Sequence, residues 1–134
     1  MILREIIDQV ADVLHRSLLR DDHPNTTKVI VCPDKSRFPG WSDVEVNVSV
    51  INTGSSFKIT LSNARNDEEY PWTWRTQEYT CEFVQATLSP DARIISQNYD
   101  VLVDFAYMIA RTITRYVDDE IERYVFHFNQ NKED

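Results

Sequence analysis

The stretch VEVNVSVI, residues 44–51, gives the clearest indication of the fold, because its side chains alternate between apolar and polar as far as Val50. A period of two is typical of a β-strand with one face packed and the other in water. The turn sequence NTGSS, residues 52–56, follows, and the alternation then resumes. We therefore predict a hairpin of two antiparallel strands, over about 43–51 and about 57–62. The inward positions are Val44, Val46, Val48, Val50, Phe57, Ile59 and Leu61.

Further apolar segments extend this hairpin into a larger antiparallel sheet. The β-branched run KVIVC predicts a strand over about 28–33, and EYTCEFVQATL predicts another over about 78–88. The sequence SPDA, residues 89–92, suits a type I turn that leads to a short fifth strand over about 93–96. The same residues also suit the start of a helix, so the fifth strand is one of two alternatives.

Apolar residues at helical spacing predict one helix at each end of the chain, over about 2–20 and about 98–128. Asp100 and Asp104 suit the positively polarised start of the second helix. We expect residues 129–134 to be frayed. The apolar positions are Leu3, Ile6, Ile7, Val10, Leu14 and Leu18 in the first helix, and Leu102, Phe105, Ile109, Thr112, Ile113 and Tyr116 in the second.

A second apolar stripe occupies the last turns of the C-terminal helix. It is rotated by roughly a third of a turn from the first stripe. Either the core curves round to cover both stripes, or a second copy of the chain covers the later one. We predict a homodimer, since four large apolar side chains are seldom left exposed together in a monomer. The predicted dimer residues are Ile121, Tyr124, Val125 and Phe128.

The order of elements predicts the fold class: a helix, an antiparallel sheet of four or five strands, and a second helix. Because the strands turn polar side chains outward, both helices should cover the same face of the sheet. The expected fold is an α+β domain of two layers, with the N-terminal helix and the long C-terminal helix packed on one face. Residues 1–134 should form a single domain, since this length can bury a core and no linker or repeat divides it.

Composition limits the kinds of partner and the cellular compartment that we expect for this protein. The chain has 22 acidic and 14 basic residues, and a net charge of −8 repels nucleic acid and anionic membranes at long range. We therefore expect no direct nucleic-acid binding, no membrane association, and a protein partner with a basic surface. Two cysteines are too few for a disulfide framework and no secretory signal is recognisable, so a soluble cytoplasmic protein is expected.

The sequence contains no recognisable motif for catalysis, metal binding or cofactor binding, so we expect no catalytic residues, no metal and no cofactor. Only two glycines are present, too few for a glycine-rich phosphate loop. The three histidines are scattered, and His15, at the edge of an apolar stripe, is interpreted as a half-buried structural residue. Cys32 and Cys81 lie on predicted strands and are interpreted as small apolar fillers.

The acidic run DDE, residues 118–120, bears on whether the protein mimics nucleic acid. A mimic should carry rows of carboxylates with few cations between them, and Arg111 and Arg115 interrupt the row on this helix. We expect helical ion pairs from Arg115 and Arg123 to neutralise most of the acidic run. This pattern weakens the interpretation as a mimic without removing it.

The segment DEEYPWTWR, residues 67–75, concentrates aromatic side chains around a proline that restricts it to an edge strand or a loop. One interpretation is that the aromatics cap the core, with at least one of Trp72 and Trp74 buried. The other is that they anchor a protein partner, together with the aromatic and cationic residues of loop 35–41. The candidate partner-binding residues are Tyr70, Trp72, Trp74, Arg75, Trp41, Phe38 and Arg37.

These features favour a small acidic, non-enzymatic protein-binding module: an adaptor, a chaperone or an inhibitor of another protein. The first alternative is an acidic inhibitor, of a kind that viruses carry, that mimics nucleic acid to block a DNA- or RNA-binding enzyme. The second is a small enzyme whose site no sequence spacing reveals. The three hypotheses predict, respectively, an exposed aromatic patch, a continuous negative patch, and a deep cleft with a perturbed ionisable group.

Overall fold

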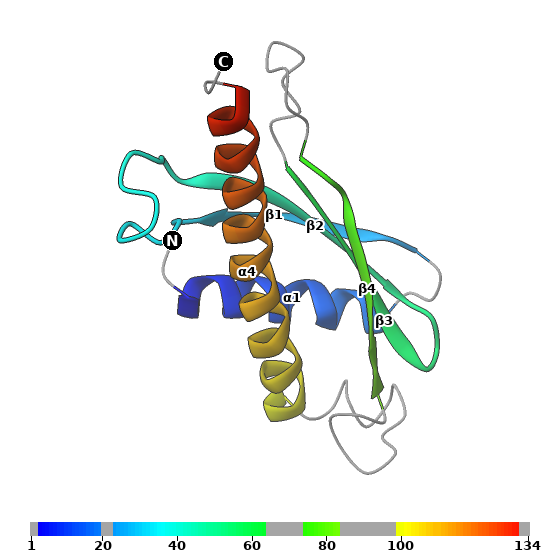
Figure 1. The fold of residues 1–134 in the computed structure, drawn as a ribbon. Helices are drawn as coiled ribbons and strands as arrows, with labels where there is room; N and C mark the ends of the chain where they lie inside the picture. Colours follow the sequence, from blue (N-terminus) through cyan, green and yellow to red (C-terminus); the bar gives the residue numbers. More distant parts are fainter. Residues whose placement is uncertain (1–2, 20–22, 64–73, 84–98, 132–134) are drawn as a thin grey trace.

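A computed structural model describes residues 3–19, 23–63, 74–83 and 99–131, with the side chains of the last helix described as far as Phe126. Within these ranges the order is helix, four strands, helix (Figure 1). The elements are α1 (Leu3–Leu18), β1 (Asn25–Val31), β2 (Val44–Asn52), β3 (Ser56–Asn63), β4 (Gln77–Glu82) and α4 (Tyr99–Asn131). This is the predicted order. The alternative fifth strand falls on residues outside the described part.

The strands form an antiparallel sheet in the order β1-β2-β3-β4, so that each strand pairs with its neighbours in sequence. The register places Val48 of β2 opposite Leu61 of β3, and Ile59 of β3 opposite Tyr79 of β4. Paired residues share a face, and this face holds the buried valines of β2. The turn between β2 and β3 places Gly54 at a φ of 95°, which favours a residue without a Cβ. The predicted hairpin is therefore confirmed.

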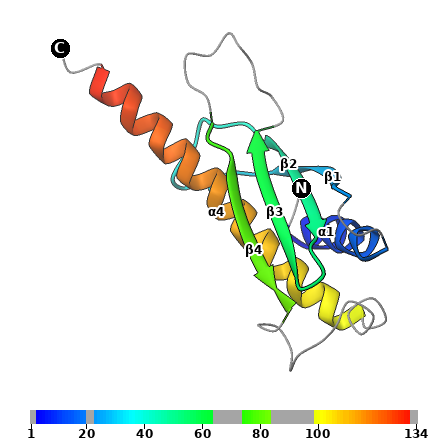
Figure 2. The same cartoon turned by 90° about the vertical axis from the view of Figure 1, so that its right-hand side faces the viewer.

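Both helices cover this face, which makes a two-layer α+β domain (Figures 1 and 2). The helix α1 packs on β1, β2 and α4. The side-chain amide of Gln9 ties it to the sheet, donating to the hydroxyl of Thr27 at 2.8 Å and to the carbonyl of Lys28 at 2.6 Å. The C-terminal end of α4 extends beyond the strands (Figure 2). The predicted fold class is confirmed.

Three phenylalanines fix the N-terminal half of α4 on the sheet. The ring of Phe57 meets those of Phe83 and Phe105 edge to face, with centroids 4.9 Å and 5.5 Å away. All three side chains are fully buried. Burial of such a ring contributes about 1.5–3 kcal/mol, and edge-to-face contact adds about 0.5–1.5 kcal/mol. This cluster anchors the helix beside the strands that flank it.

The strand β1 differs from its prediction at both ends. It begins at Asn25 rather than near residue 28, because Thr26 and Thr27 are β-branched and continue the pairing with β2. It ends at Val31, so Cys32 lies beyond the strand. The Cys32 side chain is exposed, and its interpretation as an apolar core residue is wrong.

The ends of β4 and α4 also differ from their predictions. The strand β4 ends at Glu82 and Phe83 has a helical backbone, so the strand stops well before residue 88. The helix α4 continues to Asn131, past the predicted end and into the segment expected to be frayed. Among the helices in the described ranges, none has an apolar stretch long enough to cross a membrane.

One continuous stripe of buried side chains runs along α4, so the predicted rotation between a first and a second apolar stripe does not occur. Buried positions recur every three or four residues from Leu102 to Ile121. Two members, Ala106 and Ala110, are small, and a third, Glu120, is a carboxylate. Because none of these three is a large apolar residue, the stripe looks broken in the sequence although the helix surface is continuous.

This stripe removes the argument for a dimer through residues 121–128. Ile121 is fully buried in its own chain, and Tyr124 and Val125 are half-buried. The prediction that these side chains turn away from the core is therefore wrong, because Val125 packs against it and the ring of Trp41 packs on Tyr124. The side chain of Phe128 lies outside the described part. A homodimer as such stays a prediction.

Candidate functional site

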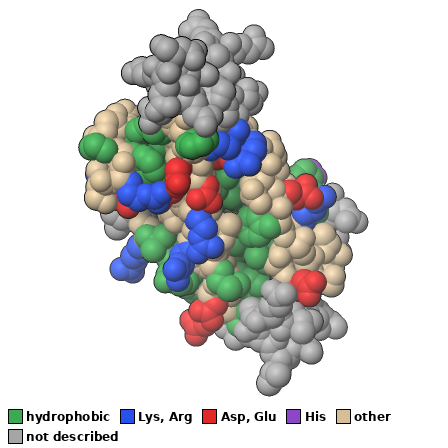
Figure 3. Space-filling model, in the orientation of Figure 1, with side chains coloured by type: hydrophobic (Ala, Val, Ile, Leu, Met, Phe, Trp, Pro, Cys, Tyr) green, Lys and Arg blue, Asp and Glu red, His purple; other side chains and the backbone are tan. Residues whose placement is uncertain are grey.

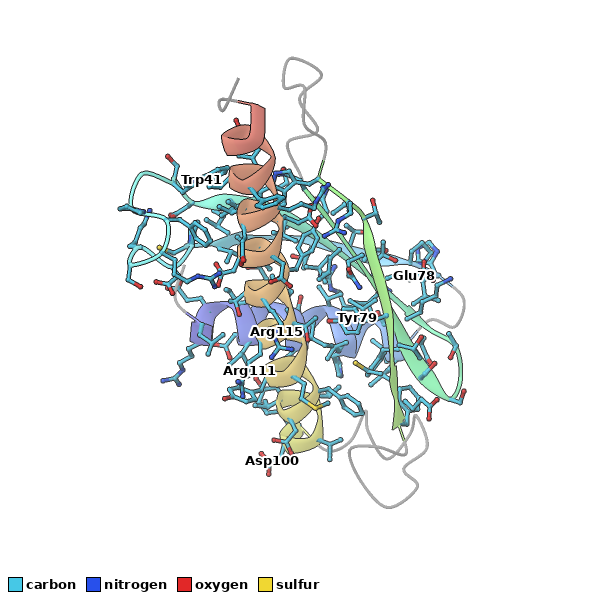
Figure 4. All side chains as sticks on the ribbon, viewed as in Figure 1. Trp41, Glu78, Tyr79, Asp100, Arg111 and Arg115 are labelled. Atoms are coloured by element: carbon cyan, nitrogen blue, oxygen red, sulfur yellow. The ribbon has the colours of Figure 1, made fainter. Side chains whose placement is uncertain are left out.

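Four of the seven predicted partner-binding residues gather around the C-terminal half of α4. Arg37 and Trp41 contact the helix from the loop between β1 and β2, which carries Trp41 beside the helix in Figure 4. Trp74 and Arg75 contact it from the residues that precede β4. No contact joins the two pairs directly in the described part of the chain, so the predicted single patch is two groups separated by a helix.

The loop between β1 and β2 is folded by a turn at Asp34. The Asp34 carboxylate accepts hydrogen bonds from the backbone N–H and the hydroxyl of Ser36, at 3.0 Å and 2.6 Å. These bonds hold the pKa of Asp34 below its ordinary value. The Asp34 carbonyl also accepts from the backbone N–H groups of Arg37 and Phe38. This local network gives the loop a defined shape before any partner is present.

The same loop holds Trp41 and Arg37 against α4. The ring of Trp41 meets that of Tyr124 edge to face, with centroids 5.4 Å apart and planes at 83°. The Lys35 ammonium donates to the carbonyl of Trp41. The Arg37 guanidinium pairs with Glu122 at 2.6 Å, and both side chains remain exposed. Two contacts of different chemistry therefore hold the loop on the helix.

Phe38 does not belong to an exposed binding surface. Its side chain is buried and forms part of the core, while the Arg37 guanidinium lies 5.0 Å from its ring centroid. The prediction that Phe38 contacts a partner is therefore wrong. Because the apolar ring of Phe38 is buried in the core, it anchors the loop between β1 and β2.

On the other side of α4, Glu120 is a buried carboxylate held by two arginines. The Glu120 residue is only 2% exposed. Its carboxylate accepts from the backbone N–H of Arg75 at 3.1 Å, from the Arg75 side chain at 2.9 Å and from Arg123 at 2.8 Å. Burial alone would raise the pKa of Glu120, but these hydrogen bonds outweigh it and lower the pKa. The carboxylate is therefore ionised at neutral pH and fully engaged.

Tyr116 completes this group. Its hydroxyl donates to the carbonyl of Arg75 at 2.7 Å, and its ring meets that of Trp74 edge to face at 5.9 Å. Burial and the nearby Glu120 carboxylate raise the pKa of Tyr116 to about 12, so the hydroxyl stays protonated and remains a donor. Trp74 is half-buried and packs against the core, whereas Arg75 is exposed.

Only one of the two arginines of α4 that were predicted to pair with the acidic run 118–120 has a salt bridge to it within the described residues. Arg123 pairs with Glu120, three residues before it, and within the described residues no salt bridge joins Arg115 to Asp118 or Asp119. Burial, the largest influence, raises the pKa of Asp118, which is half-buried beside the loop that carries Asp34. Arg123 pairs with the buried Glu120 because a carboxylate removed from water is stabilised more by an ion pair than an exposed one is.

Two predicted residues, Tyr70 and Trp72, lie outside the described residues. Conversely, the sequence did not single out Tyr116, Glu120 or Glu122 as members of a site. Glu120 stands four residues before Tyr124 and four after Tyr116, so its place within an apolar stripe is the one available signal. The positions of its partners near residue 75 are set by tertiary structure.

The remaining chemical candidates are not brought together. The side chains of His15 and His23 are exposed, which corrects the interpretation of His15 as half-buried. Cys81 lies on the edge strand β4, where burial raises its pKa, whereas Cys32 follows the opposite edge strand β1. Within the described ranges, no three side chains among His, Cys, Asp and Glu form a group suited to a metal ion.

Comparison with known proteins gives no match from which this geometry could be interpreted. No family model, curated protein or solved structure matches the chain. We refer to the exposed and half-exposed side chains Arg37, Trp41, Trp74, Arg75 and Tyr124, with Phe126 one turn beyond Glu122, as the aromatic surface.

Proposed function

We propose that the protein is a non-enzymatic protein-binding module, an adaptor, chaperone or inhibitor of another protein, that recognises its partner through the aromatic surface. Tryptophan, tyrosine and arginine are the residues most enriched at binding hot spots. The observation that supports the proposal is that the side chains of this surface that come from outside α4 are partly exposed and yet held in place by contacts with the helix; they are Arg37, Trp41, Trp74 and Arg75. Such preorganisation reduces the entropy lost on binding.

Charge suggests the kind of partner. The chain carries a net charge of −8, and Phe126, which is 63% exposed, lies one helical turn from the exposed Glu122. An exposed apolar anchor on a chain of net negative charge suits a partner surface that is basic around an apolar pocket. Long-range attraction between opposite net charges would also accelerate the encounter.

The two alternatives have less support. A mimic of nucleic acid needs unpaired carboxylates in rows, whereas Glu122 is paired with Arg37, and Glu120 with Arg75 and Arg123. An enzyme needs a titratable group with a perturbed pKa and free capacity to transfer a proton. Glu120 has a lowered pKa and three hydrogen bonds, which is the environment of a structural carboxylate.

The test is affinity capture from the native cell followed by mass spectrometry, with two matched baits besides the wild type. The first bait combines Arg37→Ala with Phe126→Ala, and the second combines Arg16→Ala with Tyr99→Ala. The removed arginines are equally exposed, 47% and 48%, and each is in an exposed ion pair; both removed aromatics are 63% exposed. The two baits thus lose the same charge and similar apolar area from different places.

We expect one protein to be captured by the wild type and by the second bait, and lost from the first. Equal capture by both altered baits would contradict recognition through the aromatic surface. A captured DNA- or RNA-binding enzyme that competes with its nucleic acid would favour the mimic instead. Thermal unfolding of all three baits should show similar midpoints, since the removed side chains are exposed.

A further inference from the structure

The exposed face of the N-terminal half of α4 carries a symmetric pattern of charge. Two acids come first, then two apolar side chains, then two arginines. Every one of these side chains is exposed, and Tyr107 and Met108 expose 45% and 44% of their surface. The six residues are Asp100, Asp104, Tyr107, Met108, Arg111 and Arg115.

Helix geometry places all six on one side. At 100° per residue they fall within an arc of roughly 100°. Figure 4 looks onto this side, with Asp100 near the start of α4 and Arg111 and Arg115 further along it. In the same orientation, Figure 3 shows acidic side chains toward the lower end of the helix and basic ones over its middle. The face is therefore a surface that another molecule can reach.

The pattern is self-complementary when two such helices run antiparallel. A two-fold axis between Tyr107 and Met108 brings Asp104 opposite the partner's Arg111, and Asp100 opposite the partner's Arg115. Symmetry doubles each pair, and at the centre Tyr107 of each copy lies opposite the partner's Met108. A parallel arrangement would instead place acid against acid and arginine against arginine.

We propose that two copies of the chain associate through this face, with their α4 helices antiparallel. Within the described residues, no salt bridge joins Arg111 or Arg115 to a carboxylate of the same chain. The Arg111 guanidinium instead lies 5.8 Å from the ring centroid of Tyr107, one of the two apolar side chains at the centre of this face. Opposite charges in register select the antiparallel orientation, and the apolar centre supplies the contact area.

This surface is distinct from the residues 121–128 predicted from the sequence. Of the predicted dimer residues, Ile121, Tyr124 and Val125 lie on the buried stripe or beside it, whereas the six proposed here lie on the solvent side of the helix. The proposal also does not depend on the aromatic surface, which occupies the other half of α4. Failure of one proposal would leave the other standing.

Charge reversal provides the test, measured by sedimentation equilibrium between about 5 and about 300 µM, a range over which weak dimers are detected. One variant is Asp104→Arg and the other is Arg111→Glu. The matched controls are Asp119→Arg and Arg4→Glu, which change the net charge equally at exposed positions outside the six residues. Circular dichroism checks that each variant is folded.

We expect a wild-type dimer, and each single variant should raise its dissociation constant about tenfold or more, since symmetry applies each change twice. An equal mixture of the two variants should recover the wild-type affinity, because each reversed charge then faces its opposite. The combined variant, Asp104→Arg with Arg111→Glu, should recover it as well. The controls should dimerise as the wild type does.

Three results would overturn the proposal: a wild type that stays monomeric over the whole range, single variants that dimerise like the wild type, or a mixture that fails to restore association. Should either variant not fold, Asp100→Arg and Arg115→Glu provide a second pair with the same logic and the same outcomes. Added salt should weaken the wild-type dimer, since the register depends on exposed charges.

Discussion

At the scale of single residues, Glu120 shows how an acidic side chain becomes part of a core. Replacing it with Gln keeps the shape and removes the charge that two arginines and a backbone N–H bind. We expect Glu120→Gln to lower the free energy of unfolding by about 2 kcal/mol, the scale of hydrogen bonds to a charged group. Urea denaturation measures the change. The control is Glu122→Gln, whose exposed pair with Arg37 should contribute less than about 1 kcal/mol.

The same carboxylate should make stability depend on pH. Because folding lowers the pKa of Glu120, the folded state favours the ionised form. The stabilisation is complete above the ordinary glutamate pKa of 4.5 and is lost as pH falls through the lower pKa of the folded state. The difference in unfolding free energy between wild type and Glu120→Gln should therefore shrink below about pH 4.5. A difference that grew on acidification would show that burial, not the arginines, controls this group.

Tyr79 provides the opposite case, a buried hydroxyl without a good partner. Burial raises its pKa, and although Thr112 on α4 partly offsets this, the two hydroxyls form no hydrogen bond of normal geometry. Tyr79→Phe should therefore leave the unfolding free energy unchanged or increase it slightly. Tyr116→Phe, which removes a donor 2.7 Å from the carbonyl of Arg75, should cost about 1 kcal/mol. Thermal denaturation of the two variants side by side distinguishes them, and a larger loss at Tyr79 would contradict this account.

At the scale of the elements, α4 has one buried side that serves the core along most of its length. Ile121 is fully buried near the end of that side. Ile121→Ala should lower the unfolding free energy by about 2–4 kcal/mol, because it leaves a cavity. The loss should not depend on protein concentration, as unfolding at several concentrations would show. A loss that appeared only in a concentration-dependent dimer would restore Ile121 to an interface. Val125→Ala, at a half-buried position, should cost less.

The helices and the central hairpin were predictable because their signals are local. The alternation in β2 requires only its own residues, and so does the stripe of α1. The stripe of α4 was misread because Ala110 packs closely and Glu120 is neutralised by Arg75, which lies 45 residues earlier in the sequence. A hydrophobic pattern in the sequence identifies large apolar residues, whereas small residues and charged residues with hydrogen-bond partners can also be buried.

At the scale of the whole molecule, the two proposed surfaces divide α4 between them. The self-association face ends at Arg115, and the aromatic surface contacts the helix from Tyr116 onward. Binding of a partner and dimerisation should therefore be independent. We expect Asp104→Arg to capture the partner with unchanged affinity per chain, and Arg37→Ala with Phe126→Ala to dimerise as the wild type does. Titration calorimetry and sedimentation measure these quantities, and loss of both functions in one variant would indicate a single shared surface.

Local patterns in the sequence were enough to predict the order of elements, the two-layer fold, the inward faces of β2 and β3, and part of the inward face of α1, from which Leu3 is exposed. These follow from periodicity and composition, which short segments carry without help from the rest of the chain. Three features became visible only in the folded chain: Phe38 is core, Ile121 is covered, and Trp41 and Trp74 contact α4 at separate places, at Tyr124 and Tyr116. The reason is physical: a side chain's exposure depends on what the fold places against it, and those neighbours come from distant parts of the chain.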